Sequence, residues 1–198
     1  MRFTRSAPPR RYRDYTRYRD LLRRDFHYRC AYCLIPEFHN GGAANFVIEH
    51  HRPVRGAYAR PDLVCDYANL YWCCSECNQN KADHWPNPQQ EAQGFRWIDP
   101  CEAWGDHDLH WQISSDGAIQ WLTPAGEFTI RRLLLHRRET LKAYWRKLHR
   151  IAALRDRLME ALWHETLSRD LKETIAQQIA ELNEFLEPPV LHRPRRER

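Results

Sequence analysis

Two pairs of cysteines constrain this chain more than any other feature of its sequence. Cys30 and Cys33 form one C-x-x-C pair, Cys74 and Cys77 form another, and 40 residues separate the pairs. A C-x-x-C turn aims two thiolates at one tetrahedral zinc ion, so the two pairs together predict a closed, structural zinc site with four cysteine ligands. The separation is wider than the loop of a compact zinc ribbon, so the ion would clamp a segment inserted between its halves.

The other cysteines do not suggest a disulfide framework. The chain has seven cysteines, an odd number, which favours metal ligation over secreted disulfides. Cys73 could replace Cys74 as a zinc ligand, although its spacing to Cys77 is less favourable. Cys65 and Cys101 are expected to be ordinary buried thiols. A redox role for either pair is disfavoured, because no thioredoxin-like βαβ pattern surrounds the cysteines.

Positive charge is concentrated at the two ends of the chain. The net charge is +5; residues 1–29 contain ten Arg against three Asp, and residues 191–198 contain four Arg against one Glu. The first segment also carries Tyr12, Tyr15 and Tyr18, and could grip the phosphates of a nucleic acid. A solvated basic tail explains the charge equally well. With no apolar signal segment and no membrane-length run, we expect a cytoplasmic protein without a membrane partner.

Hydrophobic spacing predicts the elements around the first cysteine pair. Residues 13–28 place apolar side chains at helical spacing and predict a basic amphipathic helix. Residues 38–42 predict a turn, because they contain Asn and two Gly. Residues 44–48 predict a strand that presents Glu49.

The second half of the chain predicts a hairpin and two long helices. Strands are expected at residues 110–114 and 118–122, joined by an Asp-Gly turn. Apolar residues recur at helical spacing from Leu141 to Leu162 and from Leu171 to Leu186, the second run after a candidate cap at Ser168. These apolar stripes are expected to pack on each other and on the core, with a partner-docking face as the alternative.

The region of the cysteine pairs resembles a known family. In order, it contains C-x-x-C, a hydrophobic strand ending in Ile48-Glu49-His50-His51-Arg52-Pro53, then Asn69-Leu70, then Cys74-Ser75-Glu76-Cys77-Asn78-Gln79-Asn80-Lys81. Residues 30–86 therefore resemble the core of an HNH endonuclease, the ββα-metal nuclease family, in its zinc-stapled form. Glu49 stands where that family more often has Asp, and Asn78 where it has His or Asn.

The resemblance implies a role for each motif residue. His50 would be the general base, Glu49 and Asn78 would hold one divalent ion, and Asn69 would tie the intervening loop to the strand. A carboxylate and an amide oxygen suit a hydrated Mg²⁺ or Mn²⁺, which shields charge on a phosphoryl group, and a histidine can then activate water. Adjacent strand residues point to opposite faces, so the strand must end or bend at Glu49 and His50 for both to serve one pocket.

Several basic residues near the motif are expected to contact the substrate. Lys81 is the phosphate contact best placed by motif position, and Arg52 and Arg55 are further candidates. We expect His51 to pack or to touch substrate, and His84 to mark a helix end. The expected partner is nucleic acid, with DNA ahead of RNA.

The expected fold class is therefore α+β. It comprises a ββα-metal HNH core stapled by the four-cysteine zinc site, a small β-hairpin and a C-terminal pair of long amphipathic helices. The expected division is a basic N-terminal segment at 1–29, the nuclease core at 30–93, a hairpin and helical region at 94–190 and a basic tail at 191–198.

Beyond the core, the chain resembles the tails of bacterial HNH proteins from phage-defence modules, including the Septu and retron-associated types. The residues concerned are Trp97–Cys101, the hairpin, Gly126–Ile130 and Leu135–Arg137. This resemblance implies an antiviral nuclease effector that works beside an ATPase subunit, which the C-terminal helices would bind.

The rival hypothesis is a non-catalytic zinc module that binds nucleic acid or a protein partner. Such a module would keep the cysteines and the basic ends, but it would need neither Glu49 and His50 nor Asn78. The joint presence of these residues favours the enzyme.

Overall fold

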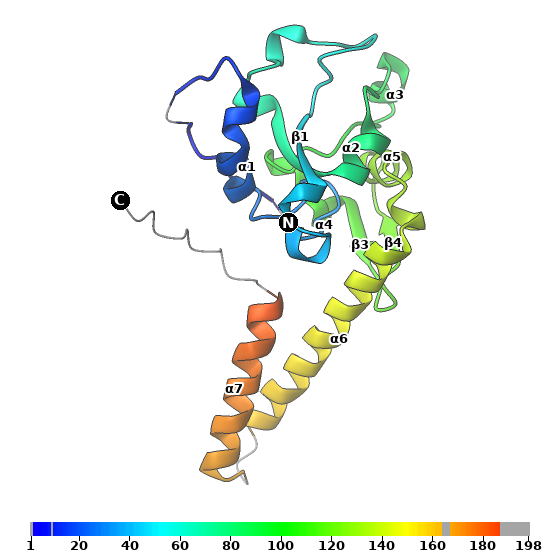
Figure 1. Ribbon diagram of the computed structural model, residues 1–198. Helices are drawn as coiled ribbons and strands as arrows, with labels where there is room; N and C mark the ends of the chain where they lie inside the picture. Colours follow the sequence, from blue (N-terminus) through cyan, green and yellow to red (C-terminus); the bar gives the residue numbers. More distant parts are fainter. Residues whose placement is uncertain (1, 9, 164–166, 187–198) are drawn as a thin grey trace, which may run out of the picture.

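The chain folds as a mixture of helices and two small β-hairpins, an α+β arrangement, in a computed structural model that describes residues 2–8, 10–163 and 167–186 (Figure 1). The hairpins and short helices form a rounded body. Two long helices, α6 (Glu139–Leu162) and α7 (Arg169–Leu186), extend away from it. The predicted α+β class is confirmed at this level.

The N-terminal segment leads into a short helix that packs on the core. A 3-10 turn at Tyr15–Tyr18 continues into α1 (Arg19–Asp25). Leu22 and Phe26 are fully buried, so the apolar stripe predicted for residues 13–28 does face the interior. The helix is shorter than that range because the chain turns sharply after α1, where two consecutive residues adopt positive φ angles.

Two antiparallel strands and a helix follow. β1 (Phe46–His50) pairs with β2 (Leu70–Cys74), and α2 (Ser75–Lys81) begins at the next residue. The register sets Glu49 opposite Tyr71. Two strands followed directly by a helix are the order that the family resemblance implies for this part of the chain.

Short elements fill most of the remaining body. They are α3 (Pro88–Ala92), α4 (His107–His110), and 3-10 turns at Glu37–His39, Ala43–Asn45, Pro61–Leu63, Tyr67–Asn69, Ala103–Gly105 and Leu135–Arg137. The predicted hairpin is present as β3 (Trp111–Ile113) and β4 (Ile119–Trp121), with a short turn between them.

Helix α5 (Pro124–Arg132) follows the hairpin and was not predicted. Thr123 caps it, because its side chain accepts a hydrogen bond from the Gly126 backbone N–H at 3.1 Å. A glycine inside a helix usually disfavours it. Here the glycine is required, since a Cβ on Gly126 would lie 2.1 Å from the His110 carbonyl oxygen.

The two predicted C-terminal helices are present. In α7 the Ser168 hydroxyl accepts a hydrogen bond from the Leu171 backbone N–H at 3.4 Å, so Ser168 lies at the predicted helix start. α7 packs along α6, and Ile175 and Ile179 of α7 are buried. The expected stop at Pro188-Pro189 and the basic tail at 191–198 lie outside the described residues.

The buried apolar side chains of the body form one cluster that runs from Phe3 to Trp145, and Ile175 and Ile179 of α7 lie outside it. It joins the N-terminal segment, the β1–β2 hairpin and the start of α6, where Leu141 and Tyr144 are buried. Within the described residues, none of the helices combines the length and apolar character needed to cross a membrane.

Gly117 allows the β3–β4 turn to lie against α6, and its replacement tests this contact. Its φ is +85°, and a Cβ would lie 2.0 Å from the Lys142 carbonyl oxygen. We expect Gly117→Ala to lower the free energy of unfolding, measured in urea, by about 2–4 kcal/mol through strain and overpacking.

Gly42→Ala is the matched control. Gly42 also has a positive φ, +82°, but faces open space. It should lose only the backbone strain, about 1–3 kcal/mol, because its φ and ψ of +82° and −176° suit glycine alone, and it should lose less than Gly117→Ala because nothing is overpacked. Equal losses in the two variants would contradict the close approach of the turn to α6.

Candidate metal centre and candidate active site

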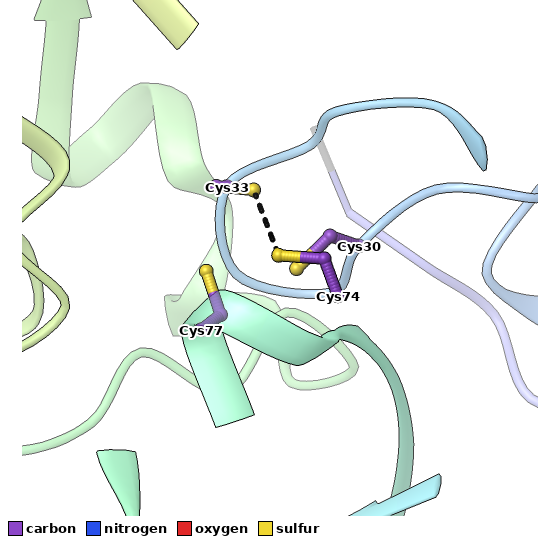
Figure 2. Close-up of side chains that lie close together, drawn as sticks. All are labelled: Cys30, Cys33, Cys74 and Cys77. Carbon is purple, nitrogen blue, oxygen red and sulfur yellow. Dashed lines mark hydrogen bonds between the residues drawn. The ribbon is translucent and has the colours of Figure 1, made fainter. Parts of the chain in front are cut away.

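The four predicted cysteines meet in the interior of the protein (Figure 2). The Sγ atoms of Cys30, Cys33, Cys74 and Cys77 all lie within 4.8 Å of one another, and all four residues are fully buried. The first pair lies in the turn that follows α1. The second pair joins the end of β2 to the first turn of α2. The cluster therefore fastens the N-terminal part of the body to the helix.

The geometry fits a structural zinc ion. Tetrahedral zinc with Zn–S bonds of about 2.3 Å places its sulfurs about 3.8 Å apart. The Sγ atoms of Cys33 and Cys74 are 3.8 Å apart. Among the described residues, this is the one group of three or more His, Cys, Asp or Glu side chains close enough to share an ion. Four thiolates leave no position for water, so such a site would be structural.

The number of protons on the four thiols depends on whether a cation is bound. Burial raises the pKa of the Cys33 and Cys77 thiols well above the usual value. Burial also opposes ionisation of Cys30, but hydrogen bonds from the neighbouring thiols outweigh it and hold the pKa of Cys30 well below the usual value. A divalent cation would bind by displacing the remaining protons, which makes binding weaker in acid.

Arg138 lies at the edge of the cluster and was not singled out from the sequence. Its Nη1 donates a hydrogen bond to Cys77 Sγ at 3.2 Å, and its Nη2 lies 2.7 Å from a Glu76 carboxylate oxygen. Burial acts to lower the pKa of Arg138, but the surrounding thiolates and Glu76 raise it. Arg138 directly precedes α6. The guanidinium therefore offsets the negative charge of the thiolates and joins the centre to the long helix.

Cys73 was the alternative ligand left open by the sequence. Its thiol donates to the Cys74 carbonyl oxygen at 3.3 Å, and its Sγ lies 3.9 Å from Cys30 Sγ. Cys73 is buried next to the cluster, but the four sulfurs that lie within mutual reach include Cys74 instead. The structure therefore favours Cys74 as the ligand.

Metal content distinguishes the two adjacent cysteines. Wild-type protein should carry about one zinc ion per chain, and Cys74→Ser should lose most of it and unfold at a lower temperature, because three thiolates hold the ion less tightly. Cys73→Ser should keep its zinc. Elemental analysis of the purified proteins, joined to thermal unfolding, makes the comparison. Zinc lost by Cys73→Ser and kept by Cys74→Ser would reverse the ligand assignment.

Glu49 lies in the interior, where both of its carboxylate oxygens are engaged. Oε1 lies 2.5 Å from Lys81 Nζ, and Oε2 accepts a hydrogen bond from the Tyr32 hydroxyl at 2.7 Å. Only 4% of Glu49 is exposed. A hydrated Mg²⁺ or Mn²⁺ ion, predicted between Glu49 and Asn78, would compete at this carboxylate with the Lys81 ammonium or the Tyr32 hydroxyl.

Lys81 is fully buried, so the prediction that it contacts a phosphate is wrong for this structure. Besides Glu49, its ammonium donates to the His50 carbonyl oxygen at 3.0 Å. Position in the motif suggested a surface residue. However, the face of α2 that carries Lys81 points towards β1, where the buried Glu49 carboxylate pairs with its ammonium group.

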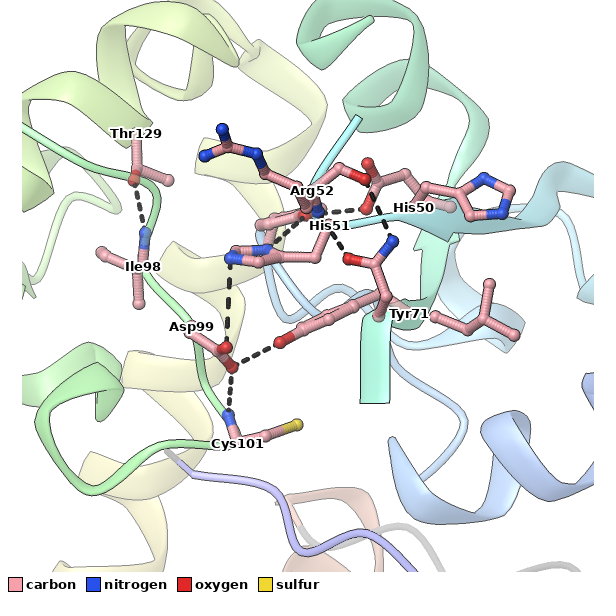
Figure 3. Close-up of polar contacts among 12 residues, drawn as sticks. His50, His51, Arg52, Tyr71, Ile98, Asp99, Cys101 and Thr129 are labelled. Carbon is pink, nitrogen blue, oxygen red and sulfur yellow. Dashed lines mark hydrogen bonds and ion pairs between the residues drawn. The ribbon is translucent and has the colours of Figure 1, made fainter. Parts of the chain in front are cut away.

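Glu49 and His50 do not share a pocket, because the strand ends only after His50 and no bend separates the two residues. β1 runs through His50, and the His51 backbone N–H extends the pairing by donating to the Asn69 carbonyl oxygen at 2.9 Å. Side chains therefore continue to alternate. Figure 3 shows the rings of His50 and His51 on opposite sides of the strand.

His50 lies on the outer side, half-buried. Its Nε2 lies 2.9 Å from the Val64 carbonyl oxygen, and because a carbonyl can only accept, the ring nitrogen donates. The Tyr15 ring meets the imidazole edge-to-face, with centroids 4.9 Å apart. In the neutral ring Nδ1 then carries a lone pair, the state required of a base.

The remaining motif residues take different positions. Asn69 makes the hydrogen bonds that the resemblance implies: its side chain accepts from the Arg52 N–H at 2.7 Å and donates to the Arg52 carbonyl at 3.0 Å. The Arg52 guanidinium lies 4.1 Å from the centre of the Trp85 ring. Arg55 is exposed, and Asn78 is half-buried on α2. Roles for these residues in catalysis stay predictions.

His51 packs on the inner side of β1. Its ring stacks on Tyr71, with centroids 4.7 Å apart, and its Nδ1 lies 3.2 Å from the Tyr32 hydroxyl. Burial lowers the pKa of His51 to about 4, so the ring is neutral near pH 7. Sequence analysis did not single out Tyr32, although it lies inside the first C-x-x-C turn, nor Asp99, whose Oδ2 lies 3.9 Å from His51 Nε2.

No family profile matches this chain, and comparison with curated proteins and with solved structures gave no match either. The functional argument therefore rests on the residues of the chain itself.

The Glu49–Lys81 pair gives a prediction about stability. Lys81→Met should lower the free energy of unfolding by about 3–5 kcal/mol, because it leaves a buried carboxylate without its cation. Adding Glu49→Gln should recover much of that loss, since the amide is neutral and its oxygen can still accept from Tyr32. Urea denaturation of the four proteins of the double-mutant cycle measures the coupling.

A surface pair serves as the control. Arg60 and Asp62 lie 2.7 Å apart, but both side chains are 56% exposed. Arg60→Met should therefore change stability by less than about 1 kcal/mol. A loss of similar size for Lys81→Met would show that Lys81 is not buried against Glu49.

Proposed function

We propose that this chain is a zinc-stapled endonuclease of the HNH type, which hydrolyses phosphodiester bonds in nucleic acid, with DNA as the expected substrate. The observation that carries the proposal is the setting of His50. It lies on a strand–strand–helix unit fastened by four cysteines, with one ring nitrogen donating to the Val64 carbonyl and with a basic segment beside it.

His50 would act as the general base. Its Nδ1 takes a proton from water, the resulting hydroxide attacks phosphorus, and the bond from phosphorus to the departing sugar oxygen breaks as that oxygen gains a proton from solvent. The Val64 carbonyl fixes the tautomer and stabilises the imidazolium that forms. Water must reach Nδ1 for this step, and the partial exposure of His50 permits it.

The N-terminal segment would hold the phosphate backbone. Tyr15 packs on His50, and the Arg13 carbonyl accepts a hydrogen bond from the Cys65 thiol at 2.9 Å, so this segment lies beside the imidazole. The side chains of Arg13 and Arg17 are exposed. Guanidinium groups bind phosphate oxygens in pairs, and their number makes binding depend on salt.

Glu49 receives a structural role in this proposal. Its carboxylate neutralises Lys81 and accepts from Tyr32, which holds the inner side of β1 in place. No step of the reaction above uses a divalent ion at Glu49. The zinc centre would position α2 against the hairpin without taking part in the chemistry.

A second candidate is a zinc module that binds nucleic acid without cutting it. The Glu49–Lys81 pair supports this candidate because it gives Glu49 a structural role that needs no catalysis. In that case the basic segment and the cysteines keep their roles, while His50 is a surface histidine. The two candidates differ in a single measurable property, cleavage.

Cleavage of supercoiled plasmid and of a single-stranded DNA tests the proposal, in Mg²⁺, in Mn²⁺ and in EDTA. Loss of a general base typically costs a factor of about 10² or more, so His50→Ala should cut at least about 100-fold more slowly. Its zinc content and unfolding curve should match those of the wild type. His84→Ala, which removes an exposed histidine just after α2, should cut normally.

Glu49→Gln separates the two roles of that residue. If Glu49 is structural, the variant should cut within a few-fold of the wild-type rate once its stability is allowed for. A loss as large as that of His50→Ala, limited to reactions with Mg²⁺ or Mn²⁺, would restore the metal-ligand role. Salt-dependent binding with no cleavage in any condition would favour the second candidate.

A further inference from the structure

A cavity lies on the side of β1 opposite His50. Its volume is about 250 Å³, and three tryptophans, Trp85, Trp97 and Trp104, form much of its lining together with His51 and Asp99. A space of this size is smaller than a pocket for a drug-sized ligand and suits a single planar ring. Neither the zinc centre nor the proposed chemistry at His50 uses it.

Two of the tryptophan rings are held in fixed positions. The Trp85 Nε1–H donates to a Glu91 carboxylate oxygen at 3.0 Å, and the Trp97 Nε1–H donates to the His84 carbonyl oxygen at 2.9 Å. Aromatic walls that are already in place lose little conformational entropy when a ring enters between them. Flat aromatic faces favour a flat aromatic ligand.

The polar side of the cavity offers two acceptors. The Tyr32 hydroxyl donates its hydrogen to Glu49, so its oxygen accepts from His51 Nδ1–H, and His51 Nε2 is left with a lone pair. Asp99 Oδ1 accepts hydrogen bonds from the Tyr71 hydroxyl and the Cys101 backbone N–H. Asp99 Oδ2 lies 3.9 Å from His51 Nε2. Two acceptors at this distance suit one donor group placed between them, such as an amino group.

Two arginines lie against the tryptophan rings of the cavity, and one of them, Arg96, lines it together with the Glu91 carboxylate. The guanidinium of Arg52 lies 4.1 Å from the centre of the Trp85 ring, and that of Arg96 lies 4.0 Å from the centre of the Trp104 ring. In aromatic cages that bind quaternary ammonium ligands, the cation lies against the open faces of the rings. Here a guanidinium group lies against each of two rings, and its positive charge disfavours a cation and favours a ligand that carries negative charge next to a planar ring.

We propose that this cavity binds an unpaired nucleobase with an exocyclic amino group, such as adenine or cytosine, while Arg52 and Arg96 contact the adjoining phosphates. The inference rests on the proposed function in taking nucleic acid as the substrate, and it adds that the strand must be unpaired there. The base stacks on the tryptophans, and its amino group donates to His51 Nε2 and Asp99 Oδ2. A base inside a duplex cannot reach such a pocket unless it leaves the stack.

Binding of labelled single strands tests this without reference to cleavage. Fluorescein-labelled oligo-dA, oligo-dC and oligo-dT of about ten nucleotides, together with an abasic strand carrying the same phosphates, are titrated by fluorescence anisotropy. Wild-type protein should bind oligo-dA and oligo-dC about tenfold more tightly than the abasic strand, with oligo-dT in between. An oligo-A RNA tests whether the sugar matters.

Matched variants locate the effect. Trp104→Ala should lose most of the advantage of oligo-dA over the abasic strand, while Trp163→Ala, which removes a tryptophan 78% exposed at the end of α6, should keep it. Asp99→Asn places an amide donor where an acceptor was, and should shift the preference from oligo-dA towards oligo-dT.

The outcomes separate the two proposals. Equal affinity of wild-type protein for oligo-dA and the abasic strand, or an unchanged ratio in Trp104→Ala, overturns the base pocket even if the protein cuts DNA. Quenching of tryptophan fluorescence by tetramethylammonium, lost in Trp104→Ala, would assign the cavity to cations and overturn it too. A retained base preference with no cleavage in any condition overturns the nuclease proposal and leaves the pocket standing.

Discussion

The convergence of four sulfurs is the constraint on which the rest of the structure depends. Cys30 and Cys33 follow α1, whereas Cys74 and Cys77 open α2, and much of the chain between them forms short turns with few hydrogen bonds of regular structure. An ion bonded to all four would set the distance between the hairpin and the helix by its bond lengths. Arg138 links α6 to the cluster, because it directly precedes α6 and its guanidinium donates a hydrogen bond to Cys77 Sγ.

The continuous strand β1 divides the region next to the cysteine cluster into two sides with different chemistry. Inside, a chain of contacts runs from Lys81 through Glu49 and Tyr32 to His51, so the carboxylate expected to hold a metal ion instead orders a packed network. Outside, His50 has one backbone partner and basic neighbours. Only the outer side has the exposure that attack on a phosphodiester needs. This division follows from the complete pairing with β2, which leaves no bulge to turn adjacent residues together.

The sequence predicted what depends on local spacing and missed what depends on tertiary contacts. Cysteine spacing predicted the cluster, and hydrophobic periodicity predicted the second hairpin, α6 and α7. Motif position could not show that Lys81 is buried, because burial depends on where the helix packs. Helix α5 was missed because Gly126 disfavours a helix locally, yet contact with His110 requires it. Asp99 and Arg138 lie in or next to segments that carry the second resemblance, but that resemblance gives neither residue a role, and both meet their partners across many residues of chain.

The arrangement also relates the two proposed sites to each other. His50 and His51 are consecutive, so their Cα atoms are about 3.8 Å apart, while their side chains leave the strand on opposite faces. A nucleic-acid strand that reached both proposed sites would cross the protein chain at Arg52. The Asn69 side chain fixes the backbone there, because it accepts from the Arg52 N–H and donates to the Arg52 carbonyl oxygen. A base fixed in the tryptophan cavity would then determine which phosphate lies at His50. Cleavage would occur at a constant offset from an unpaired, amino-bearing base, and duplex DNA would be cut only where it opens.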